Sequence, residues 1–112
     1  MPDLFLPEFE MYVLLAVAQL GDDAYGLSVR KRIESRTGRP VSVGALYTTM
    51  ARLETKGYLA AREPGAASGR RGRPRKYCSI TVSGREAVNH SVSMLQRMAD
   101  GALLDPTLEP VE

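Results

Sequence analysis

Residues 8–20 constrain the fold most, because they predict a helix that is apolar on every side. The stretch contains no Pro or Gly, and one stripe at helical spacing consists of Phe9, Tyr12, Val13, Ala16 and Leu20. The other side of the helix carries Met11, Leu14, Leu15 and Ala18. A helix of this kind needs cover on more than one side. A chain of 112 residues can hardly supply all of that cover, so we expect a partner subunit to pack against this helix.

Two further helices are expected before any strand. The spacing of apolar residues predicts a helix over residues 25–37, and Asp23 is expected to cap its start. The next helix is expected over residues 43–56, with Ser42 as its cap and Gly57 as its end. Three short helices therefore precede the first segment that resembles a strand.

The second half of the chain predicts a hairpin and a long helix. Residues 58–63 and 76–80 are short and partly aromatic or β-branched, and residues 64–75 separate them as a long tip rich in Gly, Arg and Pro. A last helix is expected to run from about residue 82 to residue 104. Its apolar residues repeat at spacings of four and three, which is typical of a helix that packs against a partner helix: Val88, Val92, Leu95, Ala99 and Ala102.

This order of elements predicts a protein that is mainly α with a small β-hairpin. A winged helix-turn-helix has the same order: its third helix enters the major groove, and its hairpin lies against the flanking DNA backbone. We therefore expect a winged helix-turn-helix DNA-binding domain over residues 1–81 and a C-terminal dimerisation helix over residues 82–104. A disordered tail is expected over residues 105–112, which contain two Pro and two Glu.

Positive charge is concentrated in the middle of the sequence. Residues 30–85 hold 14 of the 15 Lys and Arg residues and only three acids, which gives this stretch a formal charge of +11. The two ends are acidic and reduce the formal net charge of the chain to +2. Such segregation indicates that one part of the molecule meets a polyanion, and nucleic acid is the first candidate.

Two groups of residues are suited to contact DNA. The outward face of the third helix combines small side chains, hydroxyls and one base, and consists of Gly44, Ala45, Thr48, Ala51 and Arg52, flanked by Tyr47 and Thr49. An ordinary solvated helix face would carry more Glu and Lys. The hairpin adds five cations with no acid among them: Arg70, Arg71, Arg73, Arg75 and Lys76. Such a cluster is favourable where an anion offsets the mutual repulsion.

The sequence contains no sign of an enzyme, a metal site or a cofactor site. It has no Gly-rich phosphate loop, and no set of Ser, His and Asp or of paired carboxylates accompanies an obvious cleft. One Cys and one His exclude a disulfide framework and a structural zinc site. Cys78 is expected to lie in the core, and His90 to be solvated. The longest apolar run, residues 11–18, is too short to cross a membrane and has acidic flanks, so we expect a cytoplasmic protein.

Three stretches of the sequence carry a family resemblance. They are AYGLSVRKRIE at residues 24–34, SVGALYTTMARLETKGYL at residues 42–59 and RPRKYCSITVSGREAV at residues 73–88. Together they resemble the PadR family of bacterial transcriptional regulators. The resemblance implies a homodimeric repressor that binds an inverted repeat in a promoter and is released by a small effector. The short C-terminal part is similar to the subfamily with a single dimerisation helix.

The resemblance also implies roles for individual residues. Tyr25, Ser42, Tyr47, Thr48 and the basic hairpin would contact DNA. The first and last helices would form the dimer interface, with Phe9, Met11, Leu14, Leu15, Val88, Val92, Leu95, Ala99 and Ala102. Ligand pockets in this family lie between subunits near the same helices. Here an apolar pocket could be lined by Phe9, Tyr12, Met94 and Met98.

Two other functions are compatible with these residues. A basic nucleic-acid module without operator preference would bind all duplexes alike. A protein-interaction winged helix would instead use the apolar first helix and the last helix to bind another protein. The small, hydroxyl-bearing outward face of the third helix argues against both alternatives.

Overall fold

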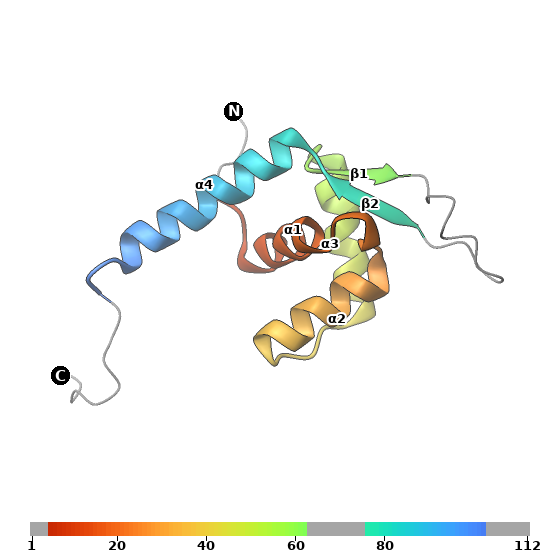
Figure 1. Cartoon of the computed structure of the whole chain (residues 1–112), viewed down its shortest axis with the longest axis horizontal. Helices are drawn as coiled ribbons and strands as arrows, with labels where there is room; N and C mark the ends of the chain where they lie inside the picture. Colours follow the sequence, from red (N-terminus) through yellow and green to blue (C-terminus); the bar gives the residue numbers. More distant parts are fainter. Residues whose placement is uncertain (1–4, 63–75, 103–112) are drawn as a thin grey trace.

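Helix α1 (Glu8–Leu20) lies at the centre of the protein, as its apolar sequence requires (Figure 1). It contacts α2 (Gly26–Thr37), α3 (Val43–Thr55), α4 (Val82–Ala99) and strand β2 (Tyr77–Ile80). These elements form a winged helix-turn-helix followed by one long helix, which confirms the predicted fold class.

The computed structural model describes residues 5–62 and 76–102. The expected hairpin tip over residues 64–75 and the expected tail over residues 105–112 lie outside the described residues. Within the described ranges, no helix is both long and apolar enough to cross a membrane.

A single chain already covers much of α1. The side chains of Val13, Leu14 and Val17 are 1% exposed or less, because three other helices and β2 pack around this helix. The expectation that a partner must cover Leu14 is therefore wrong. Several apolar residues of α1 remain half-exposed and are available to a partner: Phe9, Met11, Tyr12, Leu15 and Leu20.

The turn before α2 also differs from the prediction. Residues Gly21–Asp23 form a short 3-10 helix (η1), and the next residues, Ala24 and Tyr25, are extended. Asp23 is therefore too far from the helix to cap it. The Ser28 hydroxyl takes that part instead, since it accepts a hydrogen bond from the Tyr25 N–H at 3.0 Å.

Helix α3 begins and ends much as its sequence predicts. The Ser42 hydroxyl accepts a hydrogen bond from the Ala45 N–H at 3.1 Å, which confirms the expected cap. Beyond the last helical residue, Gly57 has a φ of 82°, in the left-handed region that favours glycine. The inward stripe of the helix is buried and consists of Leu46, Met50 and Leu53.

The hairpin pairs strand β1 (Leu59–Arg62) with β2 in antiparallel register, Leu59 opposite Ile80. The extended residues before α2 join this sheet on its other side. The Ala24 carbonyl oxygen accepts a hydrogen bond from the Cys78 N–H at 2.9 Å, and Tyr25 forms a β-bridge with Tyr77. The sequence pattern did not predict this pairing, which ties the start of α2 to the base of the hairpin.

Helix α4 packs on the body with its first half only. The residues that face the core are Gly84, Ala87, Val88 and Ser91. The Ser91 hydroxyl accepts a hydrogen bond from the Leu6 N–H at 3.2 Å, so the segment before α1 also holds this half in place.

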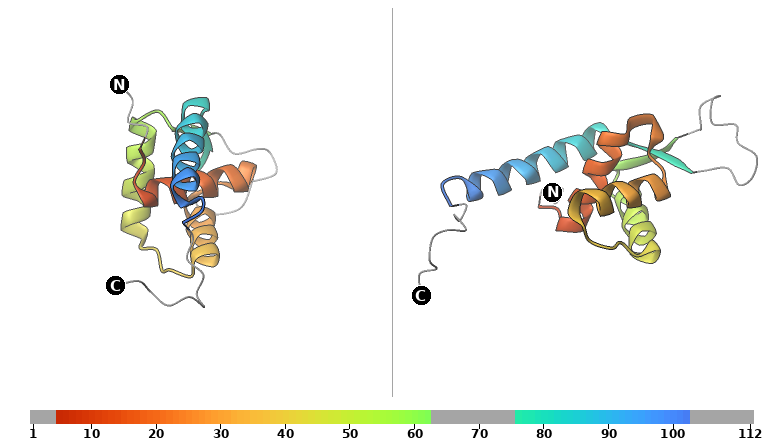
Figure 2. Two further views of the ribbon diagram at one scale, coloured as in Figure 1. Left: turned by 90° about the vertical axis from the view of Figure 1, so that its left-hand side faces the viewer. Right: turned by 60° about the horizontal axis from the view of Figure 1, so that its bottom comes forward.

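The second half of α4 projects beyond the other helices, away from the hairpin (Figures 1 and 2). Leu95 is 60% exposed and Met98 is 79% exposed on this half. The helix ends at Ala99, earlier than the predicted residue 104, since Gly101 follows with a left-handed φ of 73°.

Candidate nucleic-acid interface

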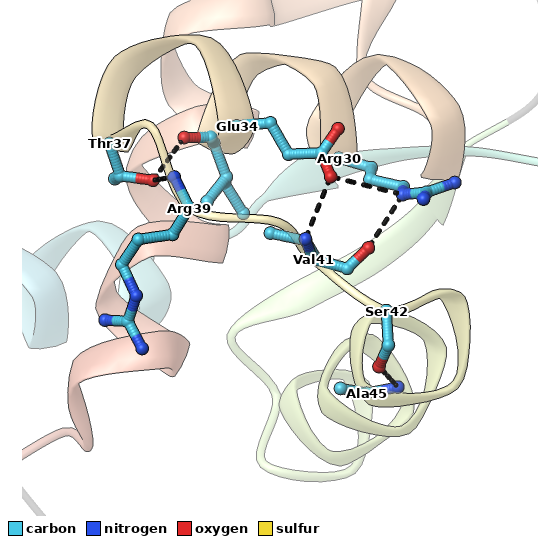
Figure 3. Close-up of polar contacts among 8 residues, drawn as sticks. Arg30, Glu34, Thr37, Arg39, Val41, Ser42 and Ala45 are labelled. Carbon is cyan, nitrogen blue, oxygen red and sulfur yellow. Dashed lines mark hydrogen bonds and ion pairs between the residues drawn. The ribbon is translucent and has the colours of Figure 1, made fainter.

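Two side chains of α2 hold the turn that places α3. The Glu34 carboxylate accepts a hydrogen bond from the Val41 N–H at 2.8 Å, and the Arg30 Nε–H donates one to the Val41 carbonyl oxygen at 2.8 Å. The Arg30 Nε and the Glu34 Oε2 lie 3.8 Å apart (Figure 3). Val41 is 6% exposed, and an unpaired backbone group would be costly there. We call these three residues the Val41 clamp; it fixes the residue directly before the cap of α3.

The first part of the same turn is closed by Thr37. Its hydroxyl donates a hydrogen bond to the Ile33 carbonyl oxygen at 2.8 Å and accepts one from the Arg39 N–H at 3.2 Å. Gly38 reverses the chain with a φ of 73°. Arg39 also lies 3.2 Å from a carboxylate oxygen of Glu8, but both side chains are well exposed, so solvent screens this ion pair.

The exposed face of α3 carries small residues and hydroxyls. Its members are Gly44, Ala45, Tyr47, Thr48, Ala51 and Arg52. A Cβ at Gly44 would meet no atom within 4 Å, so the start of this face is open. Thr49 departs from the expectation, because it lies one turn before the buried Leu53 and is itself 6% exposed. Its hydroxyl therefore does not belong to the outward face.

A cleft of about 430 Å³ separates the start of α2 from α3 and β2, and its lining includes Tyr25, Gly26, Tyr47, Glu54 and Lys76. The Tyr47 hydroxyl lies against Gly26, where any side chain would collide with the ring. The Lys76 Nζ lies 4.0 Å from a Glu54 carboxylate oxygen, but the lysine is 76% exposed, so this pair is weak. Three expected DNA contacts, Tyr25, Tyr47 and Lys76, thus border one cleft.

Aromatic contacts join this cleft to the base of the hairpin. The rings of Tyr25 and Tyr77 meet edge to face, with their centroids 5.4 Å apart. The Arg62 guanidinium lies over the Tyr77 ring at 5.0 Å and also donates a hydrogen bond to the Asp22 carbonyl oxygen. The orientation of the hairpin base is therefore coupled to the start of α2. The sequence offered only a weak signal for this contact, namely a tyrosine at the start of each element.

Arg52 is on the exposed side of α3, but it does not stand alone as expected. One of its terminal nitrogens lies 3.7 Å from a carboxylate oxygen of Glu10, and the Lys56 Nζ donates a hydrogen bond to Glu10 at 2.8 Å. Glu10 was not among the residues expected at this site. A signal was available, because residues 10, 13, 14 and 17 have the spacing of one helix face, and that face proves to be the buried one.

Cys78 is buried and is unsuited to nucleophilic chemistry. Burial raises the pKa of its thiol to about 11, with a smaller contribution from the nearby Glu54 carboxylate, so the thiol stays protonated at neutral pH. His90 is half-exposed, with the Phe5 ring 6.1 Å away. Among the described residues, no three or more His, Cys, Asp or Glu side chains gather where they could hold a metal ion.

A second cleft, of about 350 Å³, lies between α1, the turn after α2 and the start of α3. We call it the turn cleft; it is lined by Glu8, Phe9, Tyr12, Ile33, Thr37, Arg39, Pro40, Val41, Ser42 and Ala45. Phe9 and Tyr12 were expected in an effector pocket, and here they face the turn. Met94 and Met98 lie on α4 and are not part of this lining.

The residues expected at the dimer interface divide into three groups. Leu14 and Val88 are buried within the single chain, so they are core residues. Half-exposed positions are Phe9, Met11, Leu15, Val92 and Ala99, and fully exposed ones are Leu95 and Ala102. The seam of α4 thus begins in the core and continues onto the projecting half of the helix.

Residues 14–90 match the sequence pattern described as the Transcriptional regulator PadR-like family. This range includes α2, α3, both strands and the packed half of α4. No curated protein matches the sequence.

Solved structures of transcriptional regulators have a similar fold. A PadR family transcriptional regulator from Eggerthella lenta is 30% identical, with a TM-score of 0.61, and the alignment covers 84% of this chain and 81% of that one. The structure of the hsRosR-S4 complex is 22% identical with a TM-score of 0.62, covering 89% of this chain and 76% of that one. A transcriptional regulator from Clostridium thermocellum is 20% identical with a TM-score of 0.61, covering 85% and 89%.

The Val41 clamp can be tested by its effect on stability. We expect Glu34→Ala to lower the free energy of unfolding by about 1–3 kcal/mol, because it leaves the Val41 N–H buried without an acceptor. Urea unfolding measures this change. The control Lys31→Ala removes an exposed side chain from the same helix and should change stability by less than about 0.5 kcal/mol. Equal effects of the two substitutions would contradict the clamp.

Proposed function

Because the chain belongs to the PadR-like family of transcriptional regulators, we propose that it is a repressor that binds an inverted-repeat promoter operator as a homodimer. The family consists of transcriptional regulators and not of enzymes. A regulator of this kind acts on the chromosome, so we also propose that the protein works in the cytoplasm.

The exposed face of α3 is the observation that carries this proposal. Gly44 and Ala45 keep the surface low, so the helix axis can approach the base edges, and the Thr48 hydroxyl can bond a base or a phosphate. The residues that border this face would contact the phosphates of the same half-site: Tyr25, Ser42, Tyr47 and Lys76. The basic residues 70–75 would extend the contact into flanking DNA.

The homodimer is supported by the uncovered half of α4. Leu95 and Met98 are exposed there, and Val92 and Ala99 are half-exposed at helical spacing from them. Apolar side chains in this number on one projecting helix favour a partner helix. Half-exposed Met11 and other α1 residues can complete the interface. In such a dimer the spacing of the half-sites is fixed by the geometry of the interface.

Operator recognition predicts different effects for two kinds of substitution. We expect Thr48→Ala to relax sequence preference, at a cost of about 1–3 kcal/mol on the operator alone, because it removes a hydrogen bond to a base. Replacing Arg71 and Arg73 by Gln should weaken all duplexes alike and reduce the salt slope by about 1 for each phosphate that is no longer neutralised. Fluorescence anisotropy against the upstream promoter DNA and a shuffled duplex measures both effects.

The same titrations distinguish the alternatives. Wild-type protein should prefer the operator by about 10³-fold or more, and affinity should fall about 10³- to 10⁵-fold from about 50 to 200 mM salt if six to ten phosphates are neutralised. Equal binding to both duplexes would favour the non-specific module. Absence of binding at low salt would favour a protein-interaction domain.

The proposed dimer has its own test. Leu95→Asp places a charge on the projecting half of α4, outside the core of the single chain, so we expect a folded monomer. Analytical ultracentrifugation should show half the mass of the wild-type particle. The exposed Arg97→Asp serves as the control for the change in charge on the same half of the helix and should leave the mass unchanged.

We also propose that a small, largely apolar effector occupies the turn cleft. Its volume of about 350 Å³ is in the range of small-molecule sites, and its lining combines Phe9, Tyr12 and Ile33 with a few polar groups. A ligand there would contact α1 and the turn that places α3 at the same time. Differential binding to two positions of this turn would change the affinity for DNA.

The effector site can be tested with a library of small aromatic compounds. A compound that raises the melting temperature and releases operator DNA should lose both effects in Tyr12→Ala, which removes one wall of the cleft. Met98→Ala, on the exposed end of α4 and outside the lining, is the control. If the response survived Tyr12→Ala and disappeared in Met98→Ala, the effector would bind elsewhere, near α4.

A further inference from the structure

A buried carboxylate lies under the C-terminal half of α3. The Glu10 side chain is 3% exposed, and it accepts a hydrogen bond from the Lys56 Nζ at 2.8 Å. Its second oxygen lies 3.7 Å from a terminal nitrogen of Arg52. An ionised carboxylate at such a depth needs partners of opposite charge, and these two cations provide them.

Both cations come from the helix that we propose to enter the major groove. Arg52 and Lys56 are four residues apart, so they lie on one side of it, and their side chains are 53% and 30% exposed. Between residues 43 and 55, Arg52 is the only Lys or Arg in the sequence. The one base on the exposed face of α3 is therefore drawn toward α1.

We propose that Glu10 is a positioning residue that withholds Arg52 from the phosphates and so limits the charge that α3 offers to DNA of any sequence. This inference rests on the proposed DNA binding. A phosphate competes for the guanidinium with a carboxylate that is already desolvated and fixed in place, whereas an exposed carboxylate would be screened. With Arg52 held by Glu10, recognition by α3 depends on its small residues and its hydroxyls.

A purely structural role for Glu10 predicts the opposite result when its charge is removed. A loosened α3 would bind DNA less well, with an unchanged dependence on salt. A released Arg52 would add a phosphate contact, which raises affinity and steepens the dependence on salt. The sign of the change in affinity and the slope against salt therefore separate the two roles.

The first experiment compares Glu10→Gln with the wild-type protein on a random duplex and on promoter DNA. Gln retains the shape of Glu and an oxygen that accepts from Lys56. We expect affinity for both duplexes to rise about five- to tenfold at about 0.1 M salt, and the salt slope to steepen by about 1. Glu86→Gln, an exposed acid on α4, makes the same change in net charge and should have a smaller effect. Unchanged or weaker binding by a folded Glu10→Gln protein would overturn the proposal.

Arg52→Gln provides a second test that does not depend on changing a buried residue. If Arg52 is withheld, this substitution should change affinity less than about twofold and leave the salt slope unaltered, whereas a direct phosphate contact would lower the slope by about 1 and contradict the proposal. In the Arg52→Gln background, Glu10→Gln should no longer increase affinity. Wild-type protein that binds no DNA at low salt would refute the proposed function itself, not only the role of Glu10.

Discussion

Burial of α1 is the interaction on which the rest of the structure depends. Val13, Leu14 and Val17 are covered by α2, α3, α4 and β2 and have almost no exposed surface. Each fully buried aliphatic side chain of this kind contributes about 1.5–3 kcal/mol, which is large beside the net stability of a small domain. Because the hairpin, α3 and α4 all pack on this one helix, α1 fixes their positions relative to one another (Figures 1 and 2).

Apolar burial has little directional preference, so the orientation of α3 needs polar contacts as well. The Val41 clamp provides them at the start of the helix, where Arg30 and Glu34 take the place of backbone partners. Glu10 provides them near its end, through Lys56 and Arg52. The helix is thus held at both ends by charged groups from its neighbours, and its exposed face stays free of Glu and Lys. An effector in the turn cleft would act on the first of these two contacts.

Local patterns in the sequence were enough to predict most of the fold. The bounds of α1, the cap at Ser42 and the glycine after α3 follow from side-chain and backbone preferences within a few residues. The extended pair Ala24 and Tyr25 could not be predicted in this way. Its partners, Cys78 and Tyr77, come from the other half of the chain, and no local spacing indicates that the two segments meet.

The sequence by itself determined which residue types stand on the outward face of α3 and where the positive charge is concentrated, because helical period and composition are local properties. On that basis Thr49 was misplaced and Arg52 was assigned no partner. Only the tertiary structure decided that Leu14 and Val88 are core residues, that Tyr47 lies against Gly26, and that Glu10 meets a lysine 46 positions further along the chain. The physical reason is that these contacts arise where two elements cross, and the crossing is set by packing around α1 rather than by any sequence near the residues themselves.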